Sequence, residues 1–181
     1  PRKMVAVRAC FAAVAIPVLL AIAIPYLVPV YPVRESGGIL ITGASSGIGK
    51  HAAFSLAKRG FTVFAGVRNA AKGEALAAAA SADDKEVAAR LRPIVIEVTN
   101  DDSVASALAE IRAWVEESGE EFIGLVNNAG VGSGSTGGTL EKDTRRIYEV
   151  NVFGLLKVTD AFLPLILEQK SRIVNIGSIA G

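Results

Sequence analysis

A glycine-rich turn is the segment of this sequence best suited to bind an anion. It reads Thr42-Gly43-Ala44-Ser45-Ser46-Gly47-Ile48-Gly49, between a short aliphatic run and a segment of helical character. Glycines let a ligand approach the backbone closely, and a helix N-terminus offers free N–H groups and the positive end of the helix dipole to a diphosphate. A glycine-rich connection that serves only packing is the alternative. The strand–turn–helix context favours binding of a dinucleotide cofactor, by residues Thr42, Gly43, Ser45, Ser46, Gly47, Ile48 and Gly49.

The end of the second candidate strand indicates which dinucleotide binds. An acidic residue there would accept hydrogen bonds from the adenosine ribose and select NAD, whereas an Arg would receive the 2′-phosphate of NADP. The sequence reads Val67-Arg68-Asn69 and has no acid there. We therefore expect NADP rather than NAD, with Arg68 as the phosphate ligand and with Ser45 and Lys50 assisting. An Arg68 that only caps a solvent-facing strand is the alternative.

An alternation of strands and helices must position these residues. Apolar runs typical of strands are separated by longer helical stretches from residue 38 onward, with strands expected at Ile39–Thr42, Thr62–Val67, Ile94–Val98, Ile123–Val126 and Arg172–Ile176. The helices are expected near Ile48–Arg59, Ala70–Leu91, Asp102–Glu117 and Glu141–Gln169, the last opening with a loop. The pattern predicts an α/β fold with a doubly wound parallel sheet, a Rossmann fold of strand order 3-2-1-4-5. A complete fold would add at least one further strand and helix, so we expect the 181 residues to be a fragment cut at both ends.

An N-terminal membrane anchor is predicted ahead of this domain. No charged residue occurs from Ala9 to Val33, and about 20 apolar helical residues span the hydrocarbon core of a bilayer. Pro17 and Pro25 would kink such a helix, which keeps an interfacial segment open as the alternative. We expect residues 1–36 to be a single-pass anchor and linker, located in an endomembrane such as the endoplasmic reticulum. Residues 37–181 are expected to be the partial nucleotide-binding domain.

Composition narrows the functional classes. The 19 Lys and Arg residues nearly balance the 18 Asp and Glu residues, so no basic field indicates nucleic acid. One Cys and one His exclude a disulfide framework and a multi-ligand Cys/His metal site within one chain.

Four motifs together resemble the short-chain dehydrogenase/reductase family, over about residues 38–181. These are the glycine turn with its G-x-x-x-G-x-G spacing, Asn127-Asn128-Ala129-Gly130, Asn151 within EVNVFG, and Ser178 within IVNIGSIAG. The stretch around Asn151 looks most similar to the single-domain branch that includes steroid and retinol dehydrogenases. The resemblance implies a cofactor contact by Asn127, Ala129 and Gly130, and adenine contacts by Glu97 and Val98, although the family commonly has Asp where Glu97 stands.

The resemblance also implies catalytic roles. Ser178 would orient and polarise the substrate's carbonyl or hydroxyl, and Asn151 would hold a water in the proton relay. The family's acid/base is a Tyr in a Tyr-x-x-x-Lys motif downstream of the Ser, beyond Gly181, so we expect no activity from these residues alone. Tyr148 is no substitute, because it precedes Asn151 and no Lys lies four residues after it.

Two functional hypotheses follow. The first is an NADP-dependent oxidoreductase acting on a small hydrophobic alcohol or ketone, such as a steroid, retinoid or lipid intermediate. The second is a non-catalytic scaffold that kept the nucleotide fold. A sugar-nucleotide epimerase is disfavoured, because such relatives usually space the turn as G-x-x-G-x-x-G. A homo-oligomer is left open, since members of the family often form dimers or tetramers.

Overall fold

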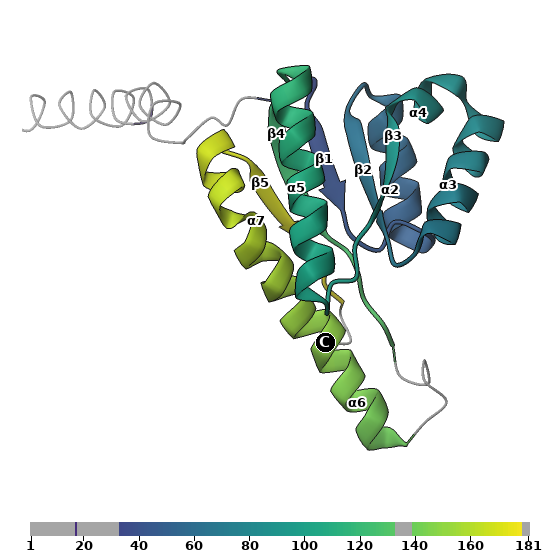
Figure 1. Cartoon of the computed structure of the whole chain (residues 1–181), viewed down its shortest axis with the longest axis vertical. Coiled ribbons are helices and arrows are strands. Elements are labelled where there is room, and N and C mark those ends of the chain that lie inside the picture. The colour runs from purple at the N-terminus through teal and green to yellow at the C-terminus, as the bar shows by residue number, and fades with distance from the viewer. Residues whose placement is uncertain (1–16, 18–32, 133–138, 179–181) are drawn as a thin grey trace, which may run out of the picture. The chain divides into compact units, whose positions relative to one another are not determined.

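The computed structural model describes residues 17, 33–132 and 139–178 of the chain. The chain divides into two compact units, residues 1–33 and 34–181. The second unit contains all the strands of the described part (Figure 1). These strands are β1 (Gly38–Ile41), β2 (Thr62–Val67), β3 (Leu91–Val95), β4 (Phe122–Asn127) and β5 (Arg172–Asn175).

The strands form one parallel sheet in the order β3-β2-β1-β4-β5, which confirms the predicted doubly wound topology. Central strand β1 pairs on both sides, with Gly38 opposite Thr62 of β2 and Phe122 of β4. All four of its residues are buried. The order reverses between β1 and β4, so the carboxyl ends of these two strands border the crevice where ligands bind in folds of this class.

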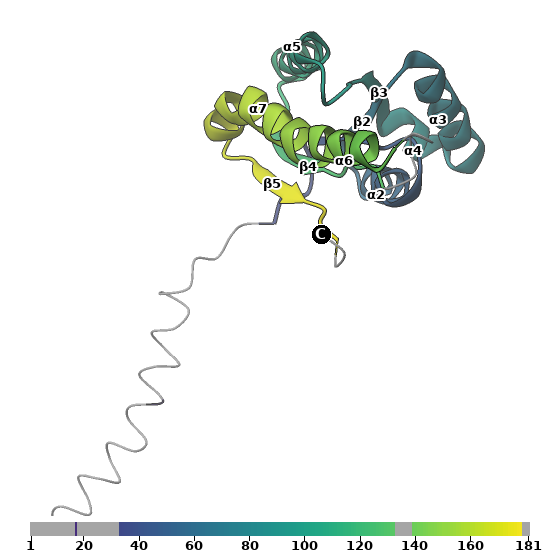
Figure 2. The same cartoon turned by 90° about the horizontal axis from the view of Figure 1, so that it is seen from below.

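Helices connect the strands and cover both faces of the sheet. They are α2 (Gly47–Lys58), α3 (Ala70–Asp83), α4 (Lys85–Arg90), α5 (Asp101–Ser118), α6 (Leu140–Tyr148), the π-helix η1 (Glu149–Gly154) and α7 (Leu155–Gln169). Figures 1 and 2 show α5 and α7 on one face, with α2 on the other.

Alternate residues of each strand supply two separate cores, as a pleated sheet requires. Leu40 and Phe64 pack with α5 and α7, whereas Ile39, Ile41 and Val63 pack with α2, α3 and α4. In the first core, the Trp114 ring of α5 meets Phe64 edge to face at 5.2 Å between centroids.

The third strand lies three residues earlier than predicted. The sequence indicated Ile94–Val98, but β3 pairs with β2 from Leu91 to Val95. Pro93 within it has no N–H to donate, and an edge strand tolerates that loss because one side of it is unpaired. The shift leaves Glu97 and Val98 beyond the strand end, where the chain turns away from the sheet.

The predicted helix Ala70–Leu91 is two helices. Asp84 breaks it with an extended backbone (φ −158°), and its carboxylate accepts a hydrogen bond from the backbone N–H of Glu86. Asp favours such capping positions because its side chain competes for backbone donors.

The last predicted helix is helical from its first residue rather than opening with a loop. Thr139 caps α6 by accepting from the backbone N–H of Lys142, and the helical path continues through η1 into α7. The π-helical turn carries Asn151, and such turns are frequent at functional sites.

The predicted membrane anchor lies, apart from Pro17 and Val33, outside the described residues and stays a prediction. Within the described part, Leu140–Gln169 is long and apolar enough to cross a membrane by length and composition alone. Its residues Val158, Phe162 and Leu165 are buried in the first core, which is the pattern of a core helix.

Candidate functional site

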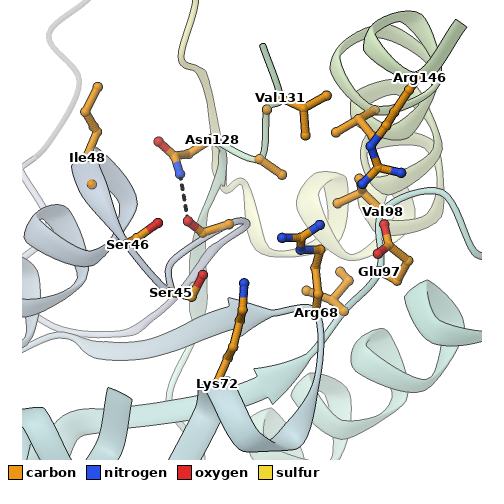
Figure 3. Close-up of a pocket in the computed structure, with 16 residues that line it drawn as sticks. Ser45, Ser46, Ile48, Arg68, Lys72, Glu97, Val98, Asn128, Val131 and Arg146 are labelled. Carbon is orange, nitrogen blue, oxygen red and sulfur yellow. Dashed lines mark hydrogen bonds between the residues drawn. The ribbon is translucent and has the colours of Figure 1, made fainter. Parts of the chain in front are cut away.

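A cavity of about 430 Å³ opens at the carboxyl ends of the central strands (Figure 3). Its walls come from the glycine turn, the end of β2, the first turn of α3, the segments after β3 and β4, and α6 with η1. Its size is in the range of small-molecule and cofactor sites. Ten residues predicted from the sequence line it: Gly43, Ser45, Ser46, Gly47, Ile48, Arg68, Glu97, Val98, Ala129 and Gly130.

The N-terminus of α2 faces this cavity with unused donors. Ser46 is the N-cap residue, its side chain makes no capping hydrogen bond, and the first turn contains no acidic residue. Among the described residues, the backbone N–H groups of Gly47, Ile48 and Gly49 have no hydrogen-bond acceptor, whereas Lys50 N donates to Ser46 O. Free amides and the positive end of the helix dipole together make a site for an anion.

Glycines let the turn pack closely against the segment after β4. Gly43 has φ +67°, and a Cβ there would lie 2.8 Å from the Cα of Ala129. A Cβ on Gly49 would lie 2.4 Å from Nδ2 of Asn128. Gly49 therefore serves packing and does not line the cavity. Gly47 has φ +56° but open space around the position of a Cβ, so it serves backbone conformation.

Thr42 joins β1 to the segment after β4 from a buried position. Its hydroxyl oxygen accepts from the backbone N–H groups of both Asn128 and Ala129, each at 3.0 Å. Asn128 in turn donates from its Nδ2 to the carbonyl oxygens of Thr42 at 2.9 Å and Gly43 at 3.2 Å. Thr42 thus shapes the cavity wall from behind and is not itself part of the lining.

Asn127 also lies outside the cavity. It is buried, and its Nδ2 donates to Oγ1 of Thr159 at 3.0 Å and to Oδ1 of Asn175 at 2.9 Å. These bonds tie β4 to α7 and β5. The neighbouring Asn128, which the sequence did not single out, lines the cavity instead.

Asn151 uses its whole side-chain amide to hold one residue. Its Oδ1 accepts from Val131 N at 2.9 Å, and its Nδ2 donates to Val131 O at 3.0 Å. Val131 and the preceding Gly130 line the cavity, whereas Asn151 does not. Ser178 is exposed beyond the end of β5 and is also outside the lining residues.

Three basic side chains from separate elements line the cavity. Arg68 follows β2, Lys72 lies in the first turn of α3, and Arg146 lies on α6. Within the described part of the chain none of the three forms an ion pair. Glu97 is the one acidic lining residue, so the lining carries a net positive charge suited to a polyanion. Lys50, predicted to assist, lies outside the lining residues, with its ammonium 5.4 Å from the centroid of the Phe54 ring.

The lining residues missed from the sequence are Lys72, Ile96, Asn128, Val131, Arg146 and Val150. The sequence offered a signal for two of them: Lys72 lies only four residues after Arg68, and Asn128 belongs to the quoted Asn-Asn-Ala-Gly motif. Arg146 and Val150 are brought in by the path of α6 and η1, which residue types alone did not reveal.

Comparisons with known proteins agree with this geometry. The family model described as short chain dehydrogenase matches residues 38–181, which confirms the resemblance read from the motifs. The mitochondrial D-beta-hydroxybutyrate dehydrogenase of Mus musculus is 40% identical over 147 residues, covering 79% of this chain and 41% of the relative. Retinol dehydrogenase 5 of Homo sapiens is 36% identical over 145 residues, covering 79% of this chain and 43% of the relative. This chain therefore spans about two fifths of the length of these relatives.

A solved structure gives the same fold. The short chain dehydrogenase from Burkholderia cenocepacia, crystallised in complex with NADP, is 28% identical with a TM-score of 0.63, and the match covers 80% of this chain and 54% of that one.

Proposed function

The chain belongs to the short-chain dehydrogenase family, and we propose that it functions in an oxidoreductase that transfers a hydride between NADP(H) and a hydrophobic alcohol or ketone. The observation that carries the proposal is the cavity where the free amides of α2 and three basic side chains surround one space. The experiments below use the full-length protein, because this chain covers only part of its relatives.

The glycine turn fits the diphosphate of the cofactor. Ser45, Ser46, Gly47 and Ile48 line the cavity, and the N–H groups of Gly47 and Ile48 are unused within the described residues. NADP(H), when bound, supplies or accepts the hydride. The chain's own contribution is to orient the cofactor by hydrogen bonds from a rigid turn, which Thr42 and Asn128 fasten to β4.

Arg68 and Lys72 support the choice of NADP over NAD. Both line the cavity, both lack an ion-pair partner among the described residues, and no acidic residue follows β2 directly. A guanidinium and an ammonium that line the same cavity suit the doubly charged 2′-phosphate, to which they would donate charge-assisted hydrogen bonds.

Ser178 and Asn151 have separate proposed roles in the reaction. Ser178 follows β5, whose carboxyl end is at the same edge of the parallel sheet as the glycine turn. From there its hydroxyl would donate a hydrogen bond to the substrate's carbonyl oxygen and stabilise the negative charge that develops. Both polar atoms of the Asn151 side chain hydrogen-bond to the backbone of Val131, so Asn151 is proposed as a positioning residue. A water of the proton relay would have to bind the backbone carbonyl of Asn151 instead.

A hydroxylated, hydrophobic substrate is proposed from two separate observations. D-beta-hydroxybutyrate dehydrogenase and retinol dehydrogenase are named for hydroxylated substrates, which supports an alcohol or the corresponding ketone. The apolar character is proposed from the uncharged stretch Ala9–Val33 alone, which would place the protein at a membrane where apolar substrates partition. The proposed location is an endomembrane such as the endoplasmic reticulum.

Titration with both reduced dinucleotides tests the cofactor part of the proposal. We expect NADPH to bind the full-length protein at least about tenfold more tightly than NADH, since one charge-assisted contact is worth roughly 1.5–3 kcal/mol. Arg68→Gln should reduce that preference and leave the affinity for NADH unchanged. Calorimetry that shows no binding of either dinucleotide would refute the proposal.

Turnover tests the catalytic part. NADPH oxidation with a panel of apolar ketones and aldehydes should be detectable and should fall at least about a hundredfold in Ser178→Ala, which loses a transition-state hydrogen bond. Dinucleotide binding without any turnover would contradict the enzyme and support the scaffold alternative.

A further inference from the structure

The chain enters the domain at the amino edge of the sheet, opposite the cofactor cavity. The uncharged stretch ends at Val33, and Arg34 is the first residue of the domain unit. Strand β1 begins four residues later, at Gly38, and leads to the glycine turn at its carboxyl end. Figure 1 shows the strand arrows pointing toward the end of the domain where α6 lies. The entry point and the cavity are therefore at opposite edges of the sheet.

The Ser-Gly-Gly junction ahead of β1 is packed into the domain, although its composition is that of a flexible linker. The carbonyl oxygen of Gly37 accepts from Thr62 N at 3.1 Å, and Gly38 N donates to Glu121 O at 2.8 Å. Gly37 has φ +121°, and a Cβ on Gly38 would lie 2.5 Å from Cζ3 of Trp114. Both glycines are buried. The junction is therefore a fixed part of the sheet edge and not a hinge.

Only a short tether separates this fixed junction from the uncharged stretch. From Val33 to Gly37 the chain has four residue steps, which span at most about 14 Å when fully extended. Arg34 shortens the tether further, because its guanidinium pairs with the Glu121 carboxylate. Both side chains are partly exposed, so that pair alone contributes about 1 kcal/mol or less, and the backbone contacts of the junction carry most of the constraint.

The tether is short compared with the height of the domain. Helix α5 runs from the carboxyl edge of the sheet to the amino edge and has 18 residues, a length of about 27 Å. With the domain turned over, a chain leaving the bilayer would have to span that height to reach the junction, about twice what the tether allows. The glycine turn at Gly43 lies about 17 Å beyond Gly38 along β1, farther than the headgroup layer of about 5–8 Å extends.

We propose that the amino edge of the sheet lies against the bilayer and that the cofactor cavity opens away from it, toward water. The inference rests on the membrane anchor of the proposed function and adds an orientation to it. This edge exposes charges of both signs, Arg59 and Lys170 beside Glu117 and Glu120, so the tether and not attraction to anionic lipid sets the orientation. A substrate dissolved in the bilayer must therefore pass through water to reach Ser178 at the opposite edge.

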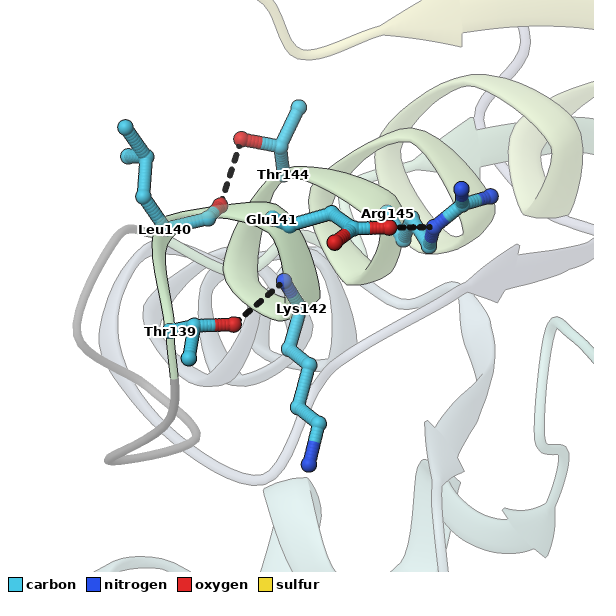
Figure 4. A network of polar contacts seen from close by, with 6 residues as sticks. All are labelled: Thr139, Leu140, Glu141, Lys142, Thr144 and Arg145. Carbon is cyan, nitrogen blue, oxygen red and sulfur yellow. Dashed lines mark hydrogen bonds and ion pairs between the residues drawn. The ribbon is translucent and has the colours of Figure 1, made fainter.

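Two helical paths each supply a matched pair of exposed positions for a label. On α5, Asp102 lies at the carboxyl edge and Glu117 at the amino edge, about 22 Å apart. On the path from α6 to α7, Lys142 lies near the first end and Lys170 directly after the last, about 40 Å apart. Figure 4 shows the Lys142 side chain pointing away from the ion pair of α6. Each pair keeps the residue type constant and changes only the edge.

The test measures quenching of a fluorophore by a headgroup-nitroxide lipid in phosphatidylcholine vesicles. The full-length protein, with its native cysteines replaced by Ser, is labelled at one introduced cysteine at a time. Quenching at Glu117→Cys should exceed that at Asp102→Cys at least about threefold, because the two positions are separated by more than the headgroup layer. Lys170→Cys should exceed Lys142→Cys in the same way.

A longer tether tests whether the junction sets this orientation. Twelve Gly and Ser residues inserted between Glu35 and Ser36 add about 17–20 Å of average reach. The inserted protein should stay on the vesicles and bind NADPH as the parent does. Its quenching ratio between the two ends of α5 should fall toward one, since the domain is then free to turn.

Three results would overturn the inference. Equal or reversed quenching at the two edges in the parent protein would remove the orientation. An unchanged ratio after the insertion would remove the role of the tether. A protein that does not sediment with the vesicles would remove the anchor on which the inference rests. NADPH titration of the same samples separates all three from failure of the cofactor proposal, in which no dinucleotide binds whatever the labels report.

Discussion

The Asn151 side chain holds both backbone polar groups of Val131, accepting from its nitrogen at 2.9 Å and donating to its oxygen at 3.0 Å. These two hydrogen bonds resemble those that two paired residues of neighbouring strands exchange, although here they join a helix to the segment after β4. Val131 and Gly130 line the cavity, so the π-helical turn that carries Asn151 fixes the wall on which the dinucleotide would rest.

Substitution of Asn151 tests that link. Asn151→Ala removes two hydrogen bonds, each worth about 0.5–1.5 kcal/mol, so we expect the free energy of unfolding to fall by about 1–2 kcal/mol and NADPH affinity to fall several-fold. Asn151→Asp keeps the acceptor but sets a charge against the Val131 carbonyl, and should do no better. Urea unfolding and NADPH titration measure both effects. The exposed Glu149→Gln in the same turn is the control, and an Asn151→Ala protein with unchanged affinity would contradict the link.

The hydroxyl of Thr42 should be needed for stability, whereas its methyl group should matter less. Thr42→Val leaves the N–H groups of Asn128 and Ala129 without their acceptor, and each unsatisfied donor costs about 1–3 kcal/mol when buried. We expect a loss of about 2–4 kcal/mol in the free energy of unfolding. Thr42→Ser keeps the oxygen and should lose about 1 kcal/mol or less. Equal losses in the two variants would show that packing, not the hydroxyl, secures the junction.

The strand order and ten of the sixteen lining residues could be predicted because they follow from local patterns. Alternating apolar and helical runs imply a parallel sheet, and the glycine spacing before α2 implies an anion-binding turn. The start of β3 could not be predicted, because Pro93 and its basic neighbours resemble a loop until the edge position of the strand is known. The helix break at Asp84 could not be predicted either, because it depends on the Asp84 carboxylate accepting a hydrogen bond from a backbone N–H rather than from solvent.

The rest of the site depends on three-dimensional placement. Asn127 and Asn128 are adjacent and chemically identical, yet the first faces α7 and β5 while the second lines the cavity. Alternation of side chains at a strand end produces that split, and the exact end of β4 is not visible in the sequence. Arg146 reaches the cavity because α6, η1 and α7 follow one helical path, and a π-helical turn has no residue signature.

Two glycines of the turn should respond differently to the same substitution. Gly43→Ala combines a positive φ with a Cβ only 2.8 Å from the backbone of Ala129, so we expect loss of the folded junction and of measurable NADPH binding. The Cβ of Gly47→Ala would meet no atom within 4 Å. The free energy of unfolding should therefore fall by only about 1–2 kcal/mol, the cost of a left-handed backbone conformation at alanine. Urea unfolding with NADPH titration separates the two. A Gly43→Ala protein as stable as Gly47→Ala would contradict the close approach.

Lys72 and Lys50 give a paired test of which ammonium binds the 2′-phosphate. Lys72 lines the cavity from the first turn of α3, whereas Lys50 lies over the Phe54 ring on α2, outside the lining. Lys72→Gln should weaken NADPH about three- to tenfold and leave NADH unchanged, because only the 2′-phosphate requires the second positive charge. The loss should shrink as salt rises, since a half-buried cation is partly screened. Lys50→Gln should leave both affinities unchanged. If instead Lys50→Gln weakened NADPH and Lys72→Gln did not, the phosphate would bind on the α2 side of the turn, and Arg68 would have to act without Lys72.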